Sequence, residues 1–328
     1  MIKQRPCLPP QLIGLTHPTK ACRSERRRGY RLIWRFRLTQ MGSRSFPPCT
    51  ARWSQLDDGA GSLSQSDVDL REQHREDYAR SVYAWLPPGV ELLTDTSGGD
   101  WIASRLRPWR KDGLRVESFM PPEFAGYARI LHPAGGRGGN HQGLPWSEVA
   151  SRLSRQFHPD VQFSHLVDGE IYEHPALGDV TPSSGSLPLS VLRSLVTFLE
   201  GWTASDEPCW FAMWDGNGTW WQGAHGGDGR FDDERDAVLT RTPRLHTEAR
   251  RYFLMRGVLV DVVPLYDAAA GQSPALWWPD DHSWLVSTEV DAFSTYVGGS
   301  EDLIAALLAN SEIEAVPTHL EAQLDWGL

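Results

Sequence analysis

The chain has 328 residues, of which 40% are hydrophobic and 23% are charged, and its formal net charge is −10. This hydrophobic content is too high for an intrinsically disordered chain, and no apolar stretch reaches the ~18 residues that a membrane-spanning helix needs. A domain of about 240 residues buries roughly 70 to 75% of its unfolded surface, so it can fold without disulfides or a structural metal.

The charge is divided unevenly along the chain. Residues 1–53 contain twelve Lys or Arg residues and one acid, Glu25, whereas the remainder contains 20 basic and 41 acidic side chains. This basic leader is compatible with nucleic-acid binding through arginines interleaved with Trp34 and Phe36, with an organelle transit peptide, or with a segment foreign to the native fold. We favour the third interpretation, because the leader lacks apolar periodicity and Met41 offers an internal start. We therefore expect a disordered or non-native leader that is dispensable.

Cysteine usage indicates the cellular compartment. Cys7, Cys22 and Cys49 lie in the basic leader, which leaves Cys209 as the single cysteine of the remainder. A secreted disulfide framework needs paired cysteines in the folded part, so a reducing compartment is indicated. Nothing in the first thirty residues resembles the apolar centre of a signal peptide, and we expect a soluble, cytosolic protein.

The folded part is predicted to be one domain over residues 66–328, preceded by a polar linker at 54–65. It opens with an amphipathic helix over 66–85, where apolar residues recur at helical spacing before the Pro-Pro-Gly at 87–89. Arginines fall on the apolar stripe in the first half of this helix, so its second half carries most of the periodic signal.

Three short extended runs follow, at 90–94, 114–119 and 127–132, and the Gly and Pro residues that bound them are typical of strands. A glycine-rich run then occupies 135–143. It lacks the Lys-Ser/Thr of a phosphate-binding loop and does not fit the GxGxxG spacing, so we predict a flexible surface loop.

Two helices are predicted in the middle of the chain. The first begins at Ser147, a favourable N-cap residue, and ends before His158 and Pro159. The second spans 188–202 and carries a continuous apolar stripe. That stripe consists of Val191, Leu192, Leu195, Phe198, Leu199 and Trp202.

The next segments read as strands and a loop. Residues 209–214 are apolar at odd and even positions, which indicates a strand covered on both faces. Turn residues at 215–218 lead to 219–221 and predict a hairpin. The polar stretch 224–250 is predicted to be a long loop, and 254–265 is apolar enough to form either a strand or a helix.

The C-terminal part is easier to interpret. Two apolar runs, 275–278 and 283–290, flank the turn residues 279–282 and predict a second hairpin. Ser300 is a favourable N-cap for a helix whose leucines and isoleucine lie on one face. Hairpins with helices before, between and after them predict an α+β fold, with a mostly antiparallel sheet packed by three to four helices.

Fifteen tryptophans give the chain an unusual composition. They form either a stacking platform for sugars or bases or a tryptophan-rich core. We favour the core, because Trp202 and Trp210 fall on predicted buried faces. Neighbouring residues of a strand point to opposite faces, so one of Trp277 and Trp278 is expected to face outward, where it is the better ligand candidate.

Tests for a metal site and for a nucleophile both give negative expectations. His158, His165 and His174 are separated by seven and nine residues, which matches no zinc-site pattern, so we predict neither a metal nor a cofactor. Cys209 has apolar neighbours that keep a thiol neutral, and the chain has no GxSxG motif for a serine nucleophile. No catalytic residue is assigned.

The acidic second hairpin is the candidate ligand-binding site. Carboxylates that lie close together raise one of their pKa values, an arrangement that general acid–base catalysis uses. Ordinary turn chemistry accounts for the same aspartates, and this interpretation stays open. The candidate residues are Trp278, Asp280, Asp281, His282, Trp284, Glu289 and Asp291.

The run LWWPDDHSWLVSTEVDAFSTYVGGSEDLIAALL, residues 276–308, resembles a signature of uncharacterised proteins from actinobacteria. Weaker similarity covers FMPPEFAGYARILHPA (119–134) and CWFAMWDGNG (209–218), so the resemblance extends over most of 87–316. It implies that members of this family begin near the first predicted helix. It carries over no catalytic residue.

Two functions from different classes remain open. The first is a non-catalytic binding or regulatory module for a protein or small-molecule partner, favoured because no nucleophile, metal set or phosphate loop is found. The alternative is a hydrolase, for example one acting on a glycan, with Asp280, Glu289 or Asp291 paired at about 5 to 9.5 Å beside tryptophans. We expect no membrane association, and contact with nucleic acid only through the basic leader.

Overall fold

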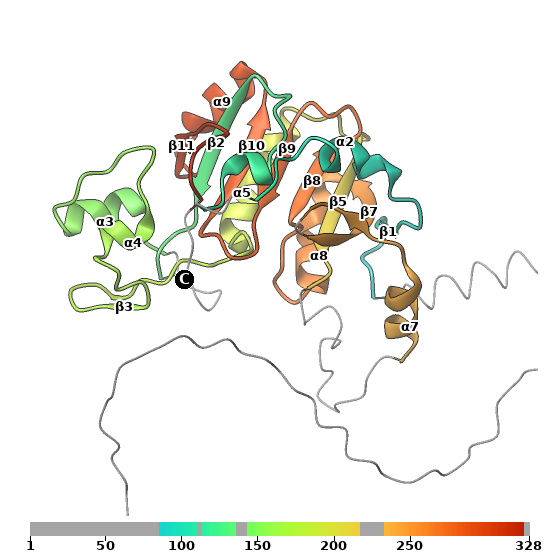
Figure 1. Ribbon diagram of the computed structural model, residues 1–328, viewed down its shortest axis with the longest axis horizontal. Coiled ribbons are helices and arrows are strands. Elements are labelled where there is room, and N and C mark those ends of the chain that lie inside the picture. Colours follow the sequence, from blue (N-terminus) through green and yellow to red (C-terminus); the bar gives the residue numbers. More distant parts are fainter. Residues whose placement is uncertain (1–84, 110–112, 136–142, 217–232, 249, 325–328) are drawn as a thin grey trace, which may run out of the picture. The chain divides into compact units, whose positions relative to one another are not determined.

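The computed structural model describes most of the chain beyond residue 84 (Figure 1). None of the helices in these residues is long and apolar enough to cross a membrane. The described ranges are 85–109, 113–135, 143–216, 233–248 and 250–324.

Several predicted segments fall outside the described residues. They are the leader 1–53, the linker 54–65, the helix over 66–85 apart from its last residue, and the partner strand 219–221. The glycine-rich run 135–143 is described only at its two ends. The division of the chain into leader, linker and domain therefore stays a prediction.

A nine-stranded sheet organises the described residues, and every pair of neighbouring strands in it is antiparallel. The predicted α+β class with a mainly antiparallel sheet is confirmed. The strand order is β1-β7-β5-β8-β9-β10-β2-β11, with β6 paired to β7, while β3 and β4 form a separate pair. The strands are β1 (Glu91–Leu92), β2 (Gly126–Leu131), β3 (Glu173–His174), β4 (Gly178–Asp179), β5 (Pro208–Trp214), β6 (Leu245–His246), β7 (Arg251–Val258), β8 (Leu276–Pro279), β9 (Leu285–Thr288), β10 (Ser294–Gly299) and β11 (Ala315–Pro317).

The described residues contain seven α-helices, more than the three to four that the sequence predicted. Two of the additional helices, α2 and α4, are four-residue turns that are too short to produce a periodic signal. The helices are α2 (Asp100–Ala103), α3 (Trp146–Arg152), α4 (Phe163–Leu166), α5 (Leu189–Glu200), α7 (Asp233–Arg241), α8 (Val262–Ala268) and α9 (Glu301–Leu308).

Both faces of the sheet are covered. Helices α5, α8 and α9 pack on one face through Leu195, Leu265 and Leu307. On the other face lie Ile102 of α2 and the segment 114–120. A separate cluster joins α3 and α4 to the end of β2, at the left of Figure 1. Because of this double cover, every residue of strands β8, β9 and β10 is buried.

The same cover corrects one expectation about the tryptophans. Trp277 and Trp278 point to opposite faces of β8, as strand geometry requires, but both are completely buried. Trp277 packs with the helices α5, α8 and α9, and Trp278 packs with Ile102 on the other face. Neither indole is therefore an outward-facing ligand candidate.

Segments with a clear hydrophobic period were predicted correctly. The run 90–94 contains β1, the runs 127–132 and 209–214 match β2 and β5 to within one residue at each end, and 188–202 contains α5. The second hairpin is formed by β8 and β9, and Ser300 caps α9 by accepting a hydrogen bond from the Leu303 N–H at 3.2 Å.

The ambiguous run 254–265 forms both kinds of element. β7 ends at Val258, and the chain then turns through Leu259–Asp261 into α8. Asp261 stabilises this turn, because its Oδ2 accepts a hydrogen bond from the Val258 N–H at 2.8 Å. A side chain at Gly257 would place a Cβ 2.7 Å from the same oxygen, so glycine at this position leaves room for the carboxylate.

The predicted strand 114–119 is wrong. Val116–Ser118 is a turn of 3-10 helix, in which the Phe119 N–H donates to the Val116 carbonyl at 2.9 Å. Leu114, Val116 and Phe119 all enter the same cluster. A strand would send residues 116 and 119 to opposite faces, so only a helical turn can bury both side chains together.

The predicted loop 224–250 is also wrong where it is described, because it contains α7 and β6. The sequence of α7, DERDAVLTR, is mostly charged, and it joins the core through Leu239. A helix with so few apolar residues shows little amphipathic period.

The N-cap of α3 lies two residues before the predicted one. Pro145, not Ser147, is the N-cap residue. The carboxylate of Glu314, distant in sequence, accepts hydrogen bonds from the backbone N–H groups of Trp146 and Ser147, the latter at 2.8 Å. A negative charge at this position also suits the positive end of the helix dipole.

A buried polar network lies near the end of β2. His132 Nδ1 is 2.6 Å from the Ser183 carbonyl oxygen, so Nδ1 carries the proton and donates. Nε2 then accepts from the Thr295 hydroxyl at 2.9 Å, and Thr295 accepts from Thr288 at 2.7 Å. Burial lowers the pKa of His132 to about 4, and the imidazole is neutral.

We predict that acidification destabilises the fold through His132. Its pKa is about 4 when folded and 6.5 as the reference value, so below about pH 6.5 the unfolded chain binds a proton that the folded chain rejects. The free energy of unfolding should fall by up to about 3 kcal/mol between those values. Urea denaturation across this pH range should show a steeper loss for the wild type than for His132→Gln. Identical pH dependence in the two proteins would contradict this role.

We predict that glycine is required at position 185, where the segment before α5 packs against the backbone of the turn after β9. Its φ is +71°, and a Cβ would lie 2.1 Å from the Val290 carbonyl oxygen. Gly185→Ala should therefore lower the free energy of unfolding by about 3 kcal/mol, through strain and a backbone clash. Gly178→Ala is the matched control, because its φ is +75° with nothing within 4 Å of the new Cβ. It should lose only about 1 kcal/mol, and equal losses in chemical denaturation would refute the clash.

Candidate functional site

The structure separates the predicted site residues. Asp280, Asp281 and His282 form the turn of the second hairpin, whereas Glu289 and Asp291 follow the far end of β9. With a rise of about 3.3 Å per residue, the two groups are roughly 15 Å or more apart. The hairpin therefore does not bring carboxylates from its two ends together across one cleft.

Trp284 belongs to neither group. Its ring is buried on the face covered by α5, α8 and α9, where it meets Trp277 edge to face at 5.5 Å. Its Nε1–H donates to the Thr203 hydroxyl at 3.0 Å. These contacts give Trp284 a structural role in the core.

The turn of the second hairpin is packed against aromatic rings. Trp210 of β5 stacks on Trp278 with a centroid distance of 6.2 Å, and its Nε1–H donates to Asp280 Oδ1 at 2.8 Å. Arg256 lies 5.2 Å above the Trp210 ring and 3.5 Å from the same carboxylate oxygen. Both contacts reach the same oxygen of Asp280, so this carboxylate has a structural role in the turn.

His282 completes this aromatic cluster. It stacks on Trp101 of α2 with a centroid distance of 4.3 Å, and its backbone adopts a φ of +57°. Burial lowers the pKa of His282, while Asp280 and Asp281 oppose that shift. The cluster fixes the turn against α2, and no short-range pattern predicts this contact because Trp101 is distant in the chain.

The far end of the hairpin centres on Arg250. Its Nη2 contacts Glu289 Oε1 and lies 3.3 Å from Asp291 Oδ2. The guanidinium also contacts two indoles, at 4.9 Å from the Trp109 ring and 5.6 Å from the Trp214 ring. Glu289 is 2% exposed, and burial raises its pKa, while the hydrogen bond from Arg250 lowers it. Arg250 therefore compensates a buried carboxylate.

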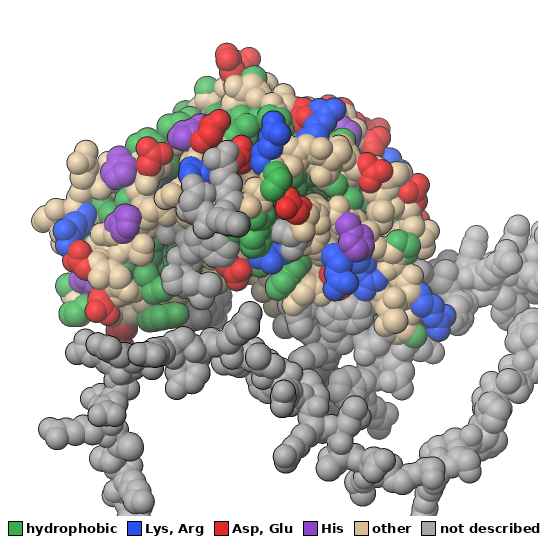
Figure 2. Space-filling model, viewed as in Figure 1, with side chains coloured by type: hydrophobic (Ala, Val, Ile, Leu, Met, Phe, Trp, Pro, Cys, Tyr) green, Lys and Arg blue, Asp and Glu red, His purple; other side chains and the backbone are tan. Residues whose placement is uncertain are grey.

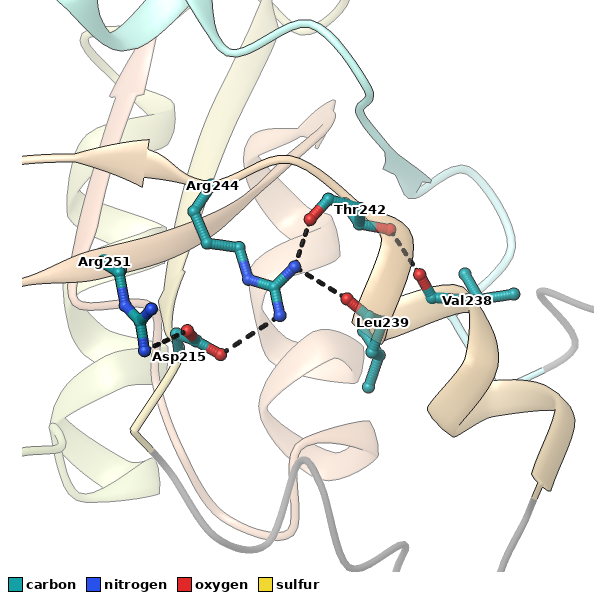
Figure 3. A network of polar contacts seen from close by, with 6 residues as sticks. All are labelled: Asp215, Val238, Leu239, Thr242, Arg244 and Arg251. Atoms are coloured by element: carbon teal, nitrogen blue, oxygen red, sulfur yellow. Dashed lines mark hydrogen bonds and ion pairs between the residues drawn. The ribbon is translucent and has the colours of Figure 1, made fainter.

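A second carboxylate, Asp215, anchors the neighbouring arginines (Figure 3). Its Oδ1 lies 3.4 Å from Arg244 Nη2, and its Oδ2 lies 3.1 Å from Arg251 Nη2. Arg244 also donates to the Leu239 carbonyl at 2.7 Å and lies 3.9 Å from the Phe253 ring. Asp215 and Arg244 thus link the end of α7 to β7.

These residues border an open groove of about 460 Å³ at the end of the β5–β7 pair. Trp214 and Arg250 lie toward one face of the sheet and Asp215 and Arg251 toward the other, because successive residues alternate. Figure 2 shows Lys or Arg side chains beside a histidine in this region, close to α7. We call it the arginine groove; its lining residues are Trp214, Asp215, Gly216, His246, Thr247, Glu248, Arg250 and Arg251.

None of the eight residues that line the arginine groove was predicted as a site residue, and four of them, His246, Thr247, Glu248 and Arg250, fall in the stretch interpreted as a loop. One signal was present. Arginines occur at 241, 244, 250, 251 and 256, an unusual density in a part of the chain that is otherwise strongly acidic. Only Glu289 and Asp291, which hold Arg250, were among the predicted residues.

Neither the cysteine nor the metal-ligating side chains of the described residues form a second candidate site. Cys209 is buried, as predicted, and burial with nearby acids raises the pKa of its thiol to about 12. Within the part of the chain that the structure describes, no three His, Cys, Asp or Glu side chains form a group that could hold a metal ion.

Comparisons with known proteins identified no relative of this chain. The chain matches no protein-family model, no curated protein and no solved structure. The chemistry of the arginine groove is therefore the basis for inferring a function.

We predict that Arg250 stabilises the fold by compensating Glu289. Arg250→Met leaves a buried carboxylate without its cation and should lower the free energy of unfolding by about 2 to 4 kcal/mol at neutral pH. The double variant with Glu289→Gln should recover part of this loss, since the uncompensated charge is removed. Asp291→Asn is the exposed control and should cost less than about 1 kcal/mol. A double variant that loses the sum of both single changes in urea denaturation would contradict the pairing.

Proposed function

We propose that the protein is a cytosolic, non-catalytic binding module whose small-molecule partner lies in the arginine groove. The observation that carries the proposal is that each of the two arginines that line the groove forms an ion pair with at least one carboxylate. Glu289 and Asp291 hold Arg250, and Asp215 holds Arg251. Side chains fixed before binding lose little conformational entropy when a ligand arrives, which favours recognition.

The hydrolase alternative has one pair of carboxylates to draw on. Glu289 and Asp291 contact the same nitrogen of Arg250, so their nearest oxygens lie within about 6 Å, close to the range that glycosidases use. The raised pKa of Glu289 also suits a general acid. Two observations favour binding instead: Glu289 is nearly inaccessible, and the guanidinium lies where a substrate would have to fit.

The resemblance of residues 276–308 to uncharacterised actinobacterial proteins stays a prediction, and it names no ligand. A cytosolic location is supported by the distribution of cysteines, of which Cys209 is buried and free.

We predict that a thermal-shift screen of the full chain against charged and neutral small molecules finds a ligand that raises Tm by about 2 °C or more. His246→Trp should abolish the shift, because His246 is exposed and lines the groove. Thr240→Trp, an exposed position on α7 that does not line the groove, is the matched control and should keep it.

The outcomes separate the two functions. If a ligand still raises the Tm of His246→Trp, it does not bind in the arginine groove, and the proposed site is wrong. Release of 4-nitrophenol from nitrophenyl glycosides, lost in Glu289→Gln, would favour the hydrolase instead.

A further inference from the structure

We infer that the arginine groove binds a small oxyanion, that is, a molecule that presents a carboxylate or a phosphate group. This inference rests on the proposed function, because it names the chemical class of the ligand that the same groove holds. Two observations support it. Arg251 is exposed at the groove while Asp215 and Glu289 are buried, and the guanidinium of Arg251 has N–H donors that no described residue uses.

Accessibility differs sharply between the two signs of charge. Two of the three carboxylates that pair with these arginines are buried: Asp215 is 6% exposed and Glu289 is 2% exposed, whereas Asp291 is 46% exposed but does not line the groove. Both oxygens of Asp215 already have an arginine partner. Arg251, in contrast, is 64% exposed at the groove. A ligand that enters therefore meets the guanidinium before it meets these carboxylates.

Arg251 also keeps hydrogen-bond donors that a ligand can reach. Its guanidinium has a single ion-pair contact among the described residues, from Nη2 to Asp215. Arg250 is only 17% exposed, and its Nε, which has no hydrogen-bond partner within the described ranges, is buried. A guanidinium carries five N–H donors in a planar fork, so accessible donors remain on Arg251. Carboxylates and phosphates are the acceptors that match this fork.

Neighbouring residues add polar groups at the same place. His246 pairs directly with Arg251 across the β6–β7 ladder, which places their Cβ atoms about 5 Å apart. The Thr247 hydroxyl donates to the Arg250 carbonyl at 3.2 Å and accepts from the Arg250 N–H at 3.2 Å. These two bonds hold the backbone at Arg250, and the next residue, Arg251, sends its side chain to the opposite face of the sheet.

Glu248 is the one acidic residue of the groove lining that is exposed. Its charge opposes an anion and would favour a cation. The sign of the effect of Glu248→Gln therefore reports directly on the charge of the ligand: loss of this carboxylate strengthens the binding of an anion and weakens the binding of a cation.

The test is isothermal titration calorimetry of the full chain at low ionic strength with three probes: inorganic phosphate, acetate and methylammonium. Phosphate and acetate distinguish the two sources of an oxyanion, and methylammonium represents a cation. Since residues 1–53 also carry many arginines, only binding that changes in groove variants is assigned to the groove.

Arg251→Ala should weaken anion binding about tenfold or more, as expected for loss of a charge-assisted hydrogen bond. Arg251→Gln keeps most of the side-chain stem and should show a similar loss, which separates a lost contact from misfolding. Glu248→Gln should tighten anion binding about twofold to fourfold. Arg241→Ala, an exposed arginine at the end of α7 that does not line the groove, should change it less than about twofold.

Binding of phosphate or acetate with this pattern supports the inference and identifies which oxyanion is preferred. Methylammonium binding that Glu248→Gln weakens would overturn it. If a neutral or cationic molecule from the thermal-shift screen binds the groove while neither anion does, the oxyanion inference fails and the proposed function survives. If nothing binds in the groove, both fail.

Discussion

Double-sided burial of the central strands is the constraint on which the rest of the structure depends. Helices α5, α8 and α9 cover one face, and α2 with segment 114–120 covers the other, so β8, β9 and β10 have no solvent-facing position. Large apolar side chains therefore occur at both parities, as the buried pair Trp277 and Trp278 illustrates, while the buried hydroxyls of Thr288 and Thr295 hydrogen-bond to each other and to His132. The charged side chains described above therefore lie beyond the ends of these strands. One end holds the aromatic turn around Asp280, and the other holds the arginine groove.

At the groove, electrostatic compensation replaces hydrophobic burial as the organising interaction. A carboxylate as buried as Glu289 is costly unless a cation accompanies it, and Arg250 both compensates it and lies near two indoles. Asp215 plays the equivalent part for Arg244 and Arg251. Asp215 and Glu289 are buried, whereas the guanidinium of Arg251 stays exposed at the groove. A surface that recognises anions can therefore arise within an acidic domain, because local accessibility and not net charge decides what a ligand meets.

Local periodicity explains which elements could be predicted. The stripe of α5, the two-sided apolar run of β5 and the N-cap of α9 each depend on residues close in sequence, and all three were predicted correctly. The run 114–119 has an apolar composition that a strand and a 3-10 turn share, and α7 has too few apolar residues to produce a period. The candidate site was harder still. Its arginines come together only through the pairing of β5 with β7 and β6 with β7, which no short-range pattern encodes.

The cap on α3 has a consequence for the order in which the chain folds during synthesis. Glu314 supplies the acceptor for the first N–H groups of α3, and β11 then pairs with β2. Translation produces Trp146 more than 160 residues before that acceptor, as the sequence separation of 168 shows. While the ribosome is still making the intervening segment, α3 has an uncapped end and β2 lacks its outer neighbour. The α3–α4 layer is thus completed after translation has passed β11, which makes it a late step of co-translational folding.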